Sequence, residues 1–185
     1  MERKQQRWLA LAGGMVVVMA VVGGLFLSGT WGSGTVNFMV HDAPCSQCSH
    51  VWITFTSVSV HGSGNSGSGW IVVNVSGATF DLQALNGSSA AKLLGVGTLA
   101  AGQYQQIRIT ISKVVVDLTS GVTLNAAIQG PNGDFNGGFT VKGGATTTLS
   151  IDVDLAASLH LTPGPGGSMN ATFTPDIATV GVSGP

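Results

Sequence analysis

The run Val51-Trp-Ile-Thr-Phe-Thr-Ser-Val-Ser-Val60 is the stretch that decides the fold of this chain. Apolar and polar residues alternate along it, which is the pattern of a β-strand with one buried face. Val51, Ile53 and Phe55 share one face at its start, and the apolar positions then shift by one residue. This change of phase predicts a β-bulge near Thr56-Ser57.

Shorter runs of the same kind follow one another through the rest of the chain and are separated by Gly, Ser and Asn. They occupy residues 35–40, 70–75, 105–111, 113–118, 121–125, 138–141, 146–154 and 171–175. Helical spacing occurs only in 80–85 and 90–94, where it predicts one or two turns. About eight or nine strands with no long helix between them predict an all-β fold, an antiparallel β-sandwich of the immunoglobulin or transthyretin kind.

Six short motifs occur in order along the same region. They are Asp42-Ala-Pro44, the strand 51–60 followed by His61, Phe80-Asp-Leu-Gln-Ala-Leu85, Gly102-Gln-Tyr-Gln-Gln-Ile-Arg108, Gly138-Phe-Thr-Val141 and Thr147-Thr-Leu-Ser-Ile-Asp-Val-Asp154. This order resembles a domain-of-unknown-function family common in bacterial and archaeal surface lipoproteins. The resemblance implies a surface location and one shared fold over nearly the whole region, and it implies almost nothing about activity.

Two features depart from that family's pattern. Many members are held by a lipidated cysteine just after the signal, whereas here no cysteine lies near Leu27. The segment Cys45-Ser-Gln-Cys48 after the Asp-Ala-Pro motif is also not part of the pattern. Anchoring is therefore expected to depend on the N-terminal apolar segment itself.

That segment, residues 8–27, contains no charged residue and follows three cations, Arg3, Lys4 and Arg7. Twenty helical residues span about 30 Å, which matches the hydrocarbon core of a bilayer. With the cations inside, we expect a cytoplasmic stub (1–7), a transmembrane signal-anchor helix (8–27), a linker (28–34) and an extracellular β-sandwich (35–185). A cleaved signal peptide is the alternative, and it also places the domain outside the cell.

The domain is poor in charge. The whole chain is 8% charged, and beyond Leu27 four Lys and Arg residues stand against seven Asp residues. The cations are scattered rather than clustered, so nucleic acid is excluded as an expected partner. Ser, Thr, Gly and Asn must supply most of the polar surface.

The densest group of reactive residues is His41-Asp-Ala-Pro-Cys-Ser-Gln-Cys-Ser-His50. Outside the membrane, a disulfide between Cys45 and Cys48 is the first expectation. The alternative is a soft-metal site, because thiolates and imidazoles suit copper or zinc, with His41, Cys45, Cys48 and His50 as ligands. His61 is a possible substitute ligand.

Other polar residues carry weaker signals. Asp152 and Asp154 lie on one side of a predicted strand, where a hard cation could join them to Asp81 or Asp42. Hydrogen bonds to neighbouring turns are the expected role instead. Asn74, Asn86 and Asn170 head N-x-[ST] triplets and are glycosylation candidates.

No motif for catalysis stands out, and we do not expect an enzyme. The sequence contains no G-x-S-x-G elbow and no paired Glu residues. The leading expectation is a membrane-anchored cell-surface module that binds or scaffolds, without a cofactor, or an accessory subunit beside another membrane or cell-surface protein. The alternative is a copper-binding or electron-transfer accessory that uses the His41, Cys45, Cys48 and His50 cluster.

Overall fold

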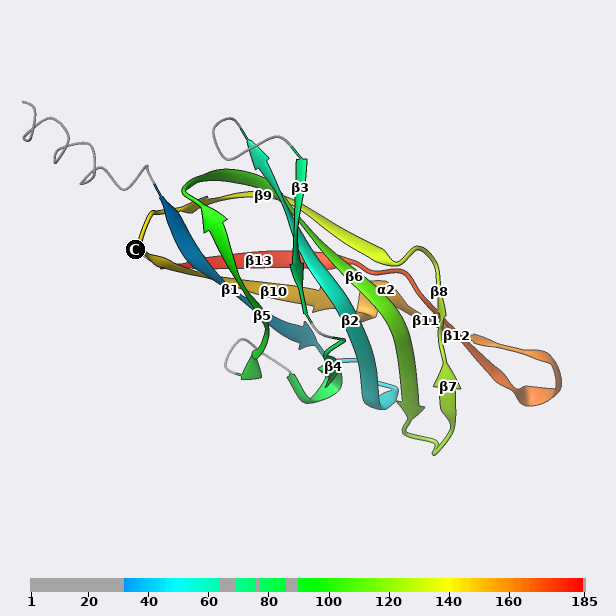
Figure 1. The fold of residues 1–185 in the computed structure, drawn as a ribbon. Coiled ribbons are helices and arrows are strands. Elements are labelled where there is room, and N and C mark those ends of the chain that lie inside the picture. Colours follow the sequence, from blue (N-terminus) through cyan, green and yellow to red (C-terminus); the bar gives the residue numbers. More distant parts are fainter. Residues whose placement is uncertain (1–31, 64–68, 76, 86–89, 185) are drawn as a thin grey trace, which may run out of the picture.

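A computed structural model describes residues 32–63, 69–75, 77–85 and 90–184 (Figure 1). Its longer strands are β1 (Ser33–Ala43), β2 (Cys48–Ser63), β3 (Gly69–Asn74), β5 (Lys92–Ala100), β6 (Gly102–Leu118), β9 (Asn132–Val141), β10 (Thr146–Asp154) and β13 (Ile177–Ser183). The shorter strands are β4 (Thr79–Asp81), β7 (Thr123–Asn125), β8 (Ala127–Ile128), β11 (Leu159–Pro163) and β12 (Met169–Phe173). Three single-turn helices are described: η2 (Leu82–Leu85), α2 (Leu155–Ser158) and η4 (Pro165–Gly167).

The strands form two large sheets and one small one. The four-stranded sheet has the order β13-β10-β1-β5. The six-stranded sheet has the order β3-β2-β6-β7, with β4 paired to β2 and β9 paired to β6. The small sheet, β11-β12-β8, contains the hairpin that projects to one side in Figure 1. The predicted all-β fold is confirmed.

The strands of these sheets pair antiparallel, as predicted, except at two places. β1 pairs parallel to β10, with Phe38 opposite Leu149 and Val40 opposite Ile151. β12 pairs parallel to β8 over two residues. β1, the first strand of the domain, lies between β10 and β5. Parallel strands cannot be joined by a tight hairpin, and β1 and β10 are indeed far apart in the sequence. Alternation alone does not report strand direction.

The core lies between the two large sheets. From the four-stranded sheet it receives Val36, Phe38, Val40, Leu149, Ile151 and Val153, and from the six-stranded sheet Val51, Ile53, Phe55, Ile107, Ile109 and Ile111. All of these side chains are essentially excluded from solvent. The predicted inward row on 105–111 is confirmed, and Arg108 lies on the opposite, outer face.

Strand β2 contains the predicted irregularity. Its register against β6 shifts between Thr54 and Phe55 and again between Phe55 and Ser57. Because of this shift, Val58 and Val60 are buried in the same core as Ile53. The bulge predicted near Thr56-Ser57 is therefore confirmed, and it keeps the inner face of one long strand apolar on both sides of the irregularity.

The two sheets approach each other closely on both sides. At the side of β3 and β5, a Cβ atom on Gly97 would lie 2.8 Å from Cγ2 of Val73. At the side of β9 and β13, a Cβ atom on Gly133 would lie 3.0 Å from Cβ of Pro175. Glycine is needed where strands of different sheets come this near.

The helical prediction was partly right. Residues 82–85 form the turn η2, with Leu82 and Leu85 buried. The stretch 90–94, also predicted as helical, enters strand β5 at Lys92, so that part was wrong. Leu94 and Leu99 point into the core from β5, and this tertiary burial outweighs the weak local helical spacing.

The described residues begin after the N-terminal apolar segment. No helix among residues 32–63, 69–75, 77–85 and 90–184 is long and apolar enough to cross a membrane. The predicted stub (1–7) and span (8–27) lie outside the described residues, as does most of the predicted linker (28–34). β1 already begins at Ser33, two residues before the predicted start of the domain.

The register of β2 gives a paired stability prediction. Phe55 is fully buried beside Phe80, at 6.2 Å between ring centroids. Thr54 faces outward, with its hydroxyl 2.9 Å from that of Thr79. Phe55→Ala should lower the free energy of unfolding by about 3–5 kcal/mol. Thr54→Ala should lower it by about 1 kcal/mol or less. Chemical denaturation measures both, and the reverse ranking would show that the strand's two faces are exchanged.

Candidate functional site

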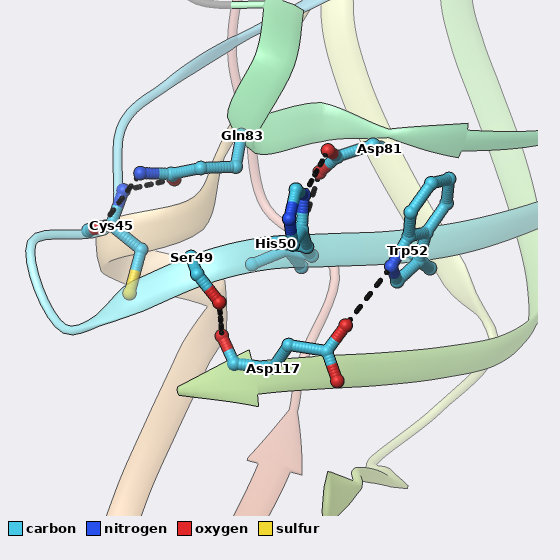
Figure 2. A network of polar contacts seen from close by, with 8 residues as sticks. Cys45, Ser49, His50, Trp52, Asp81, Gln83 and Asp117 are labelled. Carbon is cyan, nitrogen blue, oxygen red and sulfur yellow. Dashed lines mark hydrogen bonds and ion pairs between the residues drawn. The ribbon is translucent and has the colours of Figure 1, made fainter. Parts of the chain in front are cut away.

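A disulfide-bonded turn joins the two large sheets. Cys45 and Cys48 form a disulfide with 5.4 Å between their Cα atoms, directly before β2. Gln83 of η2 holds the turn from above, as Figure 2 shows, accepting from the Cys45 N–H at 2.9 Å and donating to the Cys45 carbonyl at 3.0 Å. The disulfide predicted from the spacing is present, and the turn that leads into β2 is fixed on two sides.

Asp81 binds the first residues of β2. Its Oδ2 lies 2.7 Å from Nδ1 of His50, and its Oδ1 accepts a hydrogen bond from the Val51 N–H at 3.0 Å. The neighbouring Phe80 and Leu82 pack into or against the core. The Phe-Asp-Leu motif therefore uses its apolar residues for packing and its carboxylate to hold β2 in place.

Trp52 stands next to His50 on the outer face of the six-stranded sheet (Figure 2). The two rings are stacked at 5.8 Å between centroids. The indole N–H donates to Oδ2 of Asp117 at 3.2 Å, and Oδ1 of Asp117 accepts from the Thr123 hydroxyl at 2.5 Å. Although Trp52 is 40% exposed, its ring is held by these contacts.

The electrostatics of this group favour a charged imidazole. The hydrogen bond to Asp81 raises the pKa of His50 above its ordinary value, with a smaller contribution from the charges of Asp81 and Asp117. Partial desolvation opposes the shift. The protonated ring and the carboxylate form an ion pair on an exposed surface, where such pairs position side chains more than they stabilise the fold.

A second aromatic group lies farther along the same outer face. The guanidinium carbon of Arg108 is 4.2 Å from the ring centroid of Trp70. The ring of His61 meets Trp70 edge-on, at 5.4 Å between centroids. Arg108 also donates through Nε and Nη2 to the two carboxylate oxygens of Asp134, at 2.6 and 2.7 Å.

Two further polar pairs flank Arg108 and Asp134 across strands β6 and β9. Gln106 donates to Asn136 at 2.6 Å on one side, and Thr110 donates to Asn132 at 3.1 Å on the other. We call these three pairs the polar ladder: Gln106–Asn136, Arg108–Asp134 and Thr110–Asn132. The Arg108 guanidinium lowers the pKa of Asp134 through its hydrogen bonds, so this pair stays ionised at neutral pH.

The structure does not bring the four predicted metal ligands together. The two sulfur atoms are joined to each other. His41 lies on the four-stranded sheet with Nδ1 3.5 Å from Asp152, whereas His50 and His61 belong to the six-stranded sheet. Among the described residues, no three His, Cys, Asp or Glu side chains are grouped so that they could hold a metal ion. Copper or zinc at this cluster stays a prediction without geometric support.

The remaining predicted residues have separate positions. Asp154 is the N-cap of α2, accepting from the Ala157 N–H at 2.9 Å, which is the turn-binding role expected for it. Asp152 faces His41 instead. Asn170 is exposed on β12. Asn74 lies in β3, but its side chain is outside the description, as is Asn86 altogether.

Sequence reasoning missed the Trp70 group and the carboxylates that hold the aromatic rings. Trp70 and Arg108 are 38 positions apart, and only the pairing of β3 with β2 and of β2 with β6 brings them into contact. The alternation of β6 did place Arg108 outside. The missing signal was the cross-strand register, which the sequence alone does not provide.

The fold and the outer face define a β-sandwich domain with a disulfide-bonded turn. The chain belongs to the family described as a domain of unknown function (DUF4382), whose sequence profile matches residues 33–175. This confirms the family resemblance. The match includes every element from β1 to β12 and ends before β13.

Other comparisons add little. No curated protein matches the chain. Among solved structures, a proposed cell adhesion protein from Bacteroides eggerthii is similar with 11% sequence identity and a TM-score of 0.32, over 83% of this chain and 54% of that one. This chain thus spans about half the length of that protein, and a likeness at this score supports no conclusion about function.

The state of the two cysteines can be tested directly. We expect thiol titration of the denatured, non-reduced protein to find no free thiol and to find both thiols after reduction, and we expect no bound copper or zinc by elemental analysis. The pair Cys45→Ser and Cys48→Ser should lower the free energy of unfolding by only about 2 kcal/mol, because the closed loop is short. Two free thiols with one metal ion per chain would contradict the disulfide.

The His50–Asp81 pair predicts a pH effect of definite sign. Because the folded state raises the pKa of His50, the stability from its protonated form is complete below the ordinary pKa of about 6.5 and is lost as pH rises through the folded pKa. NMR titration of the His50 ring should give a midpoint above 6.5. The isosteric Asp81→Asn should lower that midpoint, and an unchanged midpoint in this variant would contradict the assigned cause.

Proposed function

We propose that this protein is a non-enzymatic binding or structural module of the cell surface, held at the membrane by its N-terminal apolar segment. The observation that carries the proposal is the outer face of the six-stranded sheet. Two tryptophans remain substantially exposed there, yet both are fixed by neighbouring side chains. An exposed aromatic ring that is already ordered loses little conformational entropy when it binds a partner.

The polar groups of this face favour binding over catalysis. The carboxylates of Asp81, Asp117 and Asp134 each engage a side chain of the face. Groups engaged in this way position other side chains. His50 can exchange a proton, but its Nδ1 is already held by Asp81, so the fixed tryptophans remain the feature that favours binding.

The disulfide supports an exported location. Disulfides persist in oxidising compartments outside the cytosol, and the Cys45–Cys48 bond fixes the turn before β2. Exposed Asn170 on β12 would be a glycosylation acceptor in a cell that modifies exported proteins. Both features agree with an outward-facing domain.

The tether limits where a partner can be. β1 begins at Ser33, so only a few residues separate the domain from the apolar segment that ends at Leu27. The five residues 28–32 can span at most about 18 Å even when fully extended. The domain therefore stays near the bilayer, and its partner is best sought in or on the same membrane.

Co-purification tests this function. The full chain, tagged and extracted in mild detergent after cross-linking, should recover at least one membrane or cell-surface component. A form that lacks residues 1–27 should recover it at least tenfold less well, because tethering raises the effective concentration of partners in the same membrane. A full chain that is always a solitary monomer would contradict the accessory role.

A further inference from the structure

Trp70 is partly covered by two neighbouring side chains and partly exposed. The Arg108 guanidinium occupies one π-face at 4.2 Å, and His61 occupies an edge. The residue nevertheless keeps 36% of its surface exposed, and Val72, which faces the same way on β3, is 58% exposed. Ser59 is buried on this outer face, opposite both Val72 and Arg108 in register. The indole of Trp70 and the side chain of Val72 are thus the exposed apolar groups beside Arg108 on this outer face.

The polar ladder lies beside Trp70. Its members on β9, namely Asn132, Asp134 and Asn136, are all exposed. Successive members lie two residues apart on one strand, so the ladder offers hydrogen-bonding groups at intervals of about 7 Å. In each pair the partners fix one another, and amide and guanidinium groups retain further donors and acceptors beyond the bonds they make within the pair.

We infer that Trp70 and the polar ladder form a binding site for a neutral polysaccharide. The inference rests on the proposed function and specifies the ligand class of that same face. A pyranose ring has an apolar C–H face, which can stack on an exposed indole, and a rim of hydroxyl groups, which both donate and accept hydrogen bonds. Trp70 matches the apolar face of the sugar, and the polar ladder matches its hydroxyl groups.

The charge distribution favours a neutral ligand. The ladder contains one cation and one anion, and Arg108 and Asp134 already neutralise each other through two hydrogen bonds. An anionic ligand would have to compete with Asp134 for Arg108. A cationic ligand on Trp70 would meet an indole one face of which already holds the guanidinium. A neutral polar ligand neither competes with Asp134 nor is repelled by the Arg108 guanidinium.

The same features disfavour a protein as occupant. The core of a stable protein interface is largely apolar and depleted of charged groups. Here the apolar surface beside the polar ladder consists of Trp70 and Val72, which face the same way on β3, and a row of polar pairs adjoins it directly. Repeated hydrogen-bonding groups beside one exposed aromatic ring suit a ligand that repeats its hydroxyl groups along a chain.

The test uses the full chain in detergent and soluble polysaccharides as probes. Affinity electrophoresis would screen neutral dextran, mannan, galactomannan, xylan and mixed-linkage β-glucan, with alginate and heparin as anionic probes. Isothermal titration would then measure the probe that retards migration. Trp70→Ala should weaken binding at least tenfold, Trp70→Phe less, and Asn136→Ala severalfold. Val96→Ala, which removes an exposed apolar side chain on β5 of the other large sheet, should leave binding unchanged.

Each outcome either supports or contradicts the proposed polysaccharide site. Retardation by a neutral polysaccharide that depends on Trp70 but not on Val96 supports the site. Binding to none of the neutral probes, equal binding by folded Trp70→Ala, or salt-sensitive binding to alginate or heparin alone would overturn it. Capture of a cell-surface protein that depends on Trp70 would also overturn it.

Circular dichroism of each variant excludes unfolding as the cause of lost binding. Trp70→Phe is used instead if Trp70→Ala does not fold. Co-purification of a membrane partner is a separate readout, so the surface role can stand if the polysaccharide site fails.

Discussion

The pairing of β2 with β6 is the interaction on which the rest of the structure depends. These two strands, of 16 and 17 residues, run antiparallel from Cys48 opposite Leu118 to Ser63 opposite Gln103. Their inner faces supply Ile53, Phe55, Ile109 and other core residues. Their outer faces carry the His50–Trp52 pair, and also His61 and Arg108, which contact Trp70 of β3. A single ladder therefore determines the packing of the sandwich and the spacing of the exposed side chains.

The inner face could be predicted from the sequence, because a strand that is buried on one side has an apolar residue at every second position. The bulge near Thr56-Ser57 was visible as a change of phase, and the pairing register shows that change between Phe55 and Ser57. Strand direction was not visible. The parallel pairing of β1 with β10 depends on which distant strand lies next to Phe38, and alternation has no information about that.

The candidate site was only half predictable for a related reason. The disulfide joins residues three apart, so the sequence alone shows that the two cysteines are close. His50 and Asp81 are 31 residues apart and Trp52 and Asp117 are 65 apart, so these contacts appear only after the strands are paired. The sequence likewise did not show that His41 and His50, close neighbours along the chain, belong to different sheets.

The outer face of the six-stranded sheet gives a physical reason for the low charge of the chain. With so few ionised groups, a surface avoids non-specific attraction to charged partners, but it must obtain specificity from shape and hydrogen bonds. Fixed aromatic rings and mutually paired polar side chains supply both. Arg108 illustrates the principle: it pairs with Asp134 and also lies against Trp70, so its charge orders an aromatic ring although the side chain stays partly exposed. Arg108 and Asp117 each hold a tryptophan of this face, and those two rings are what a ligand would meet.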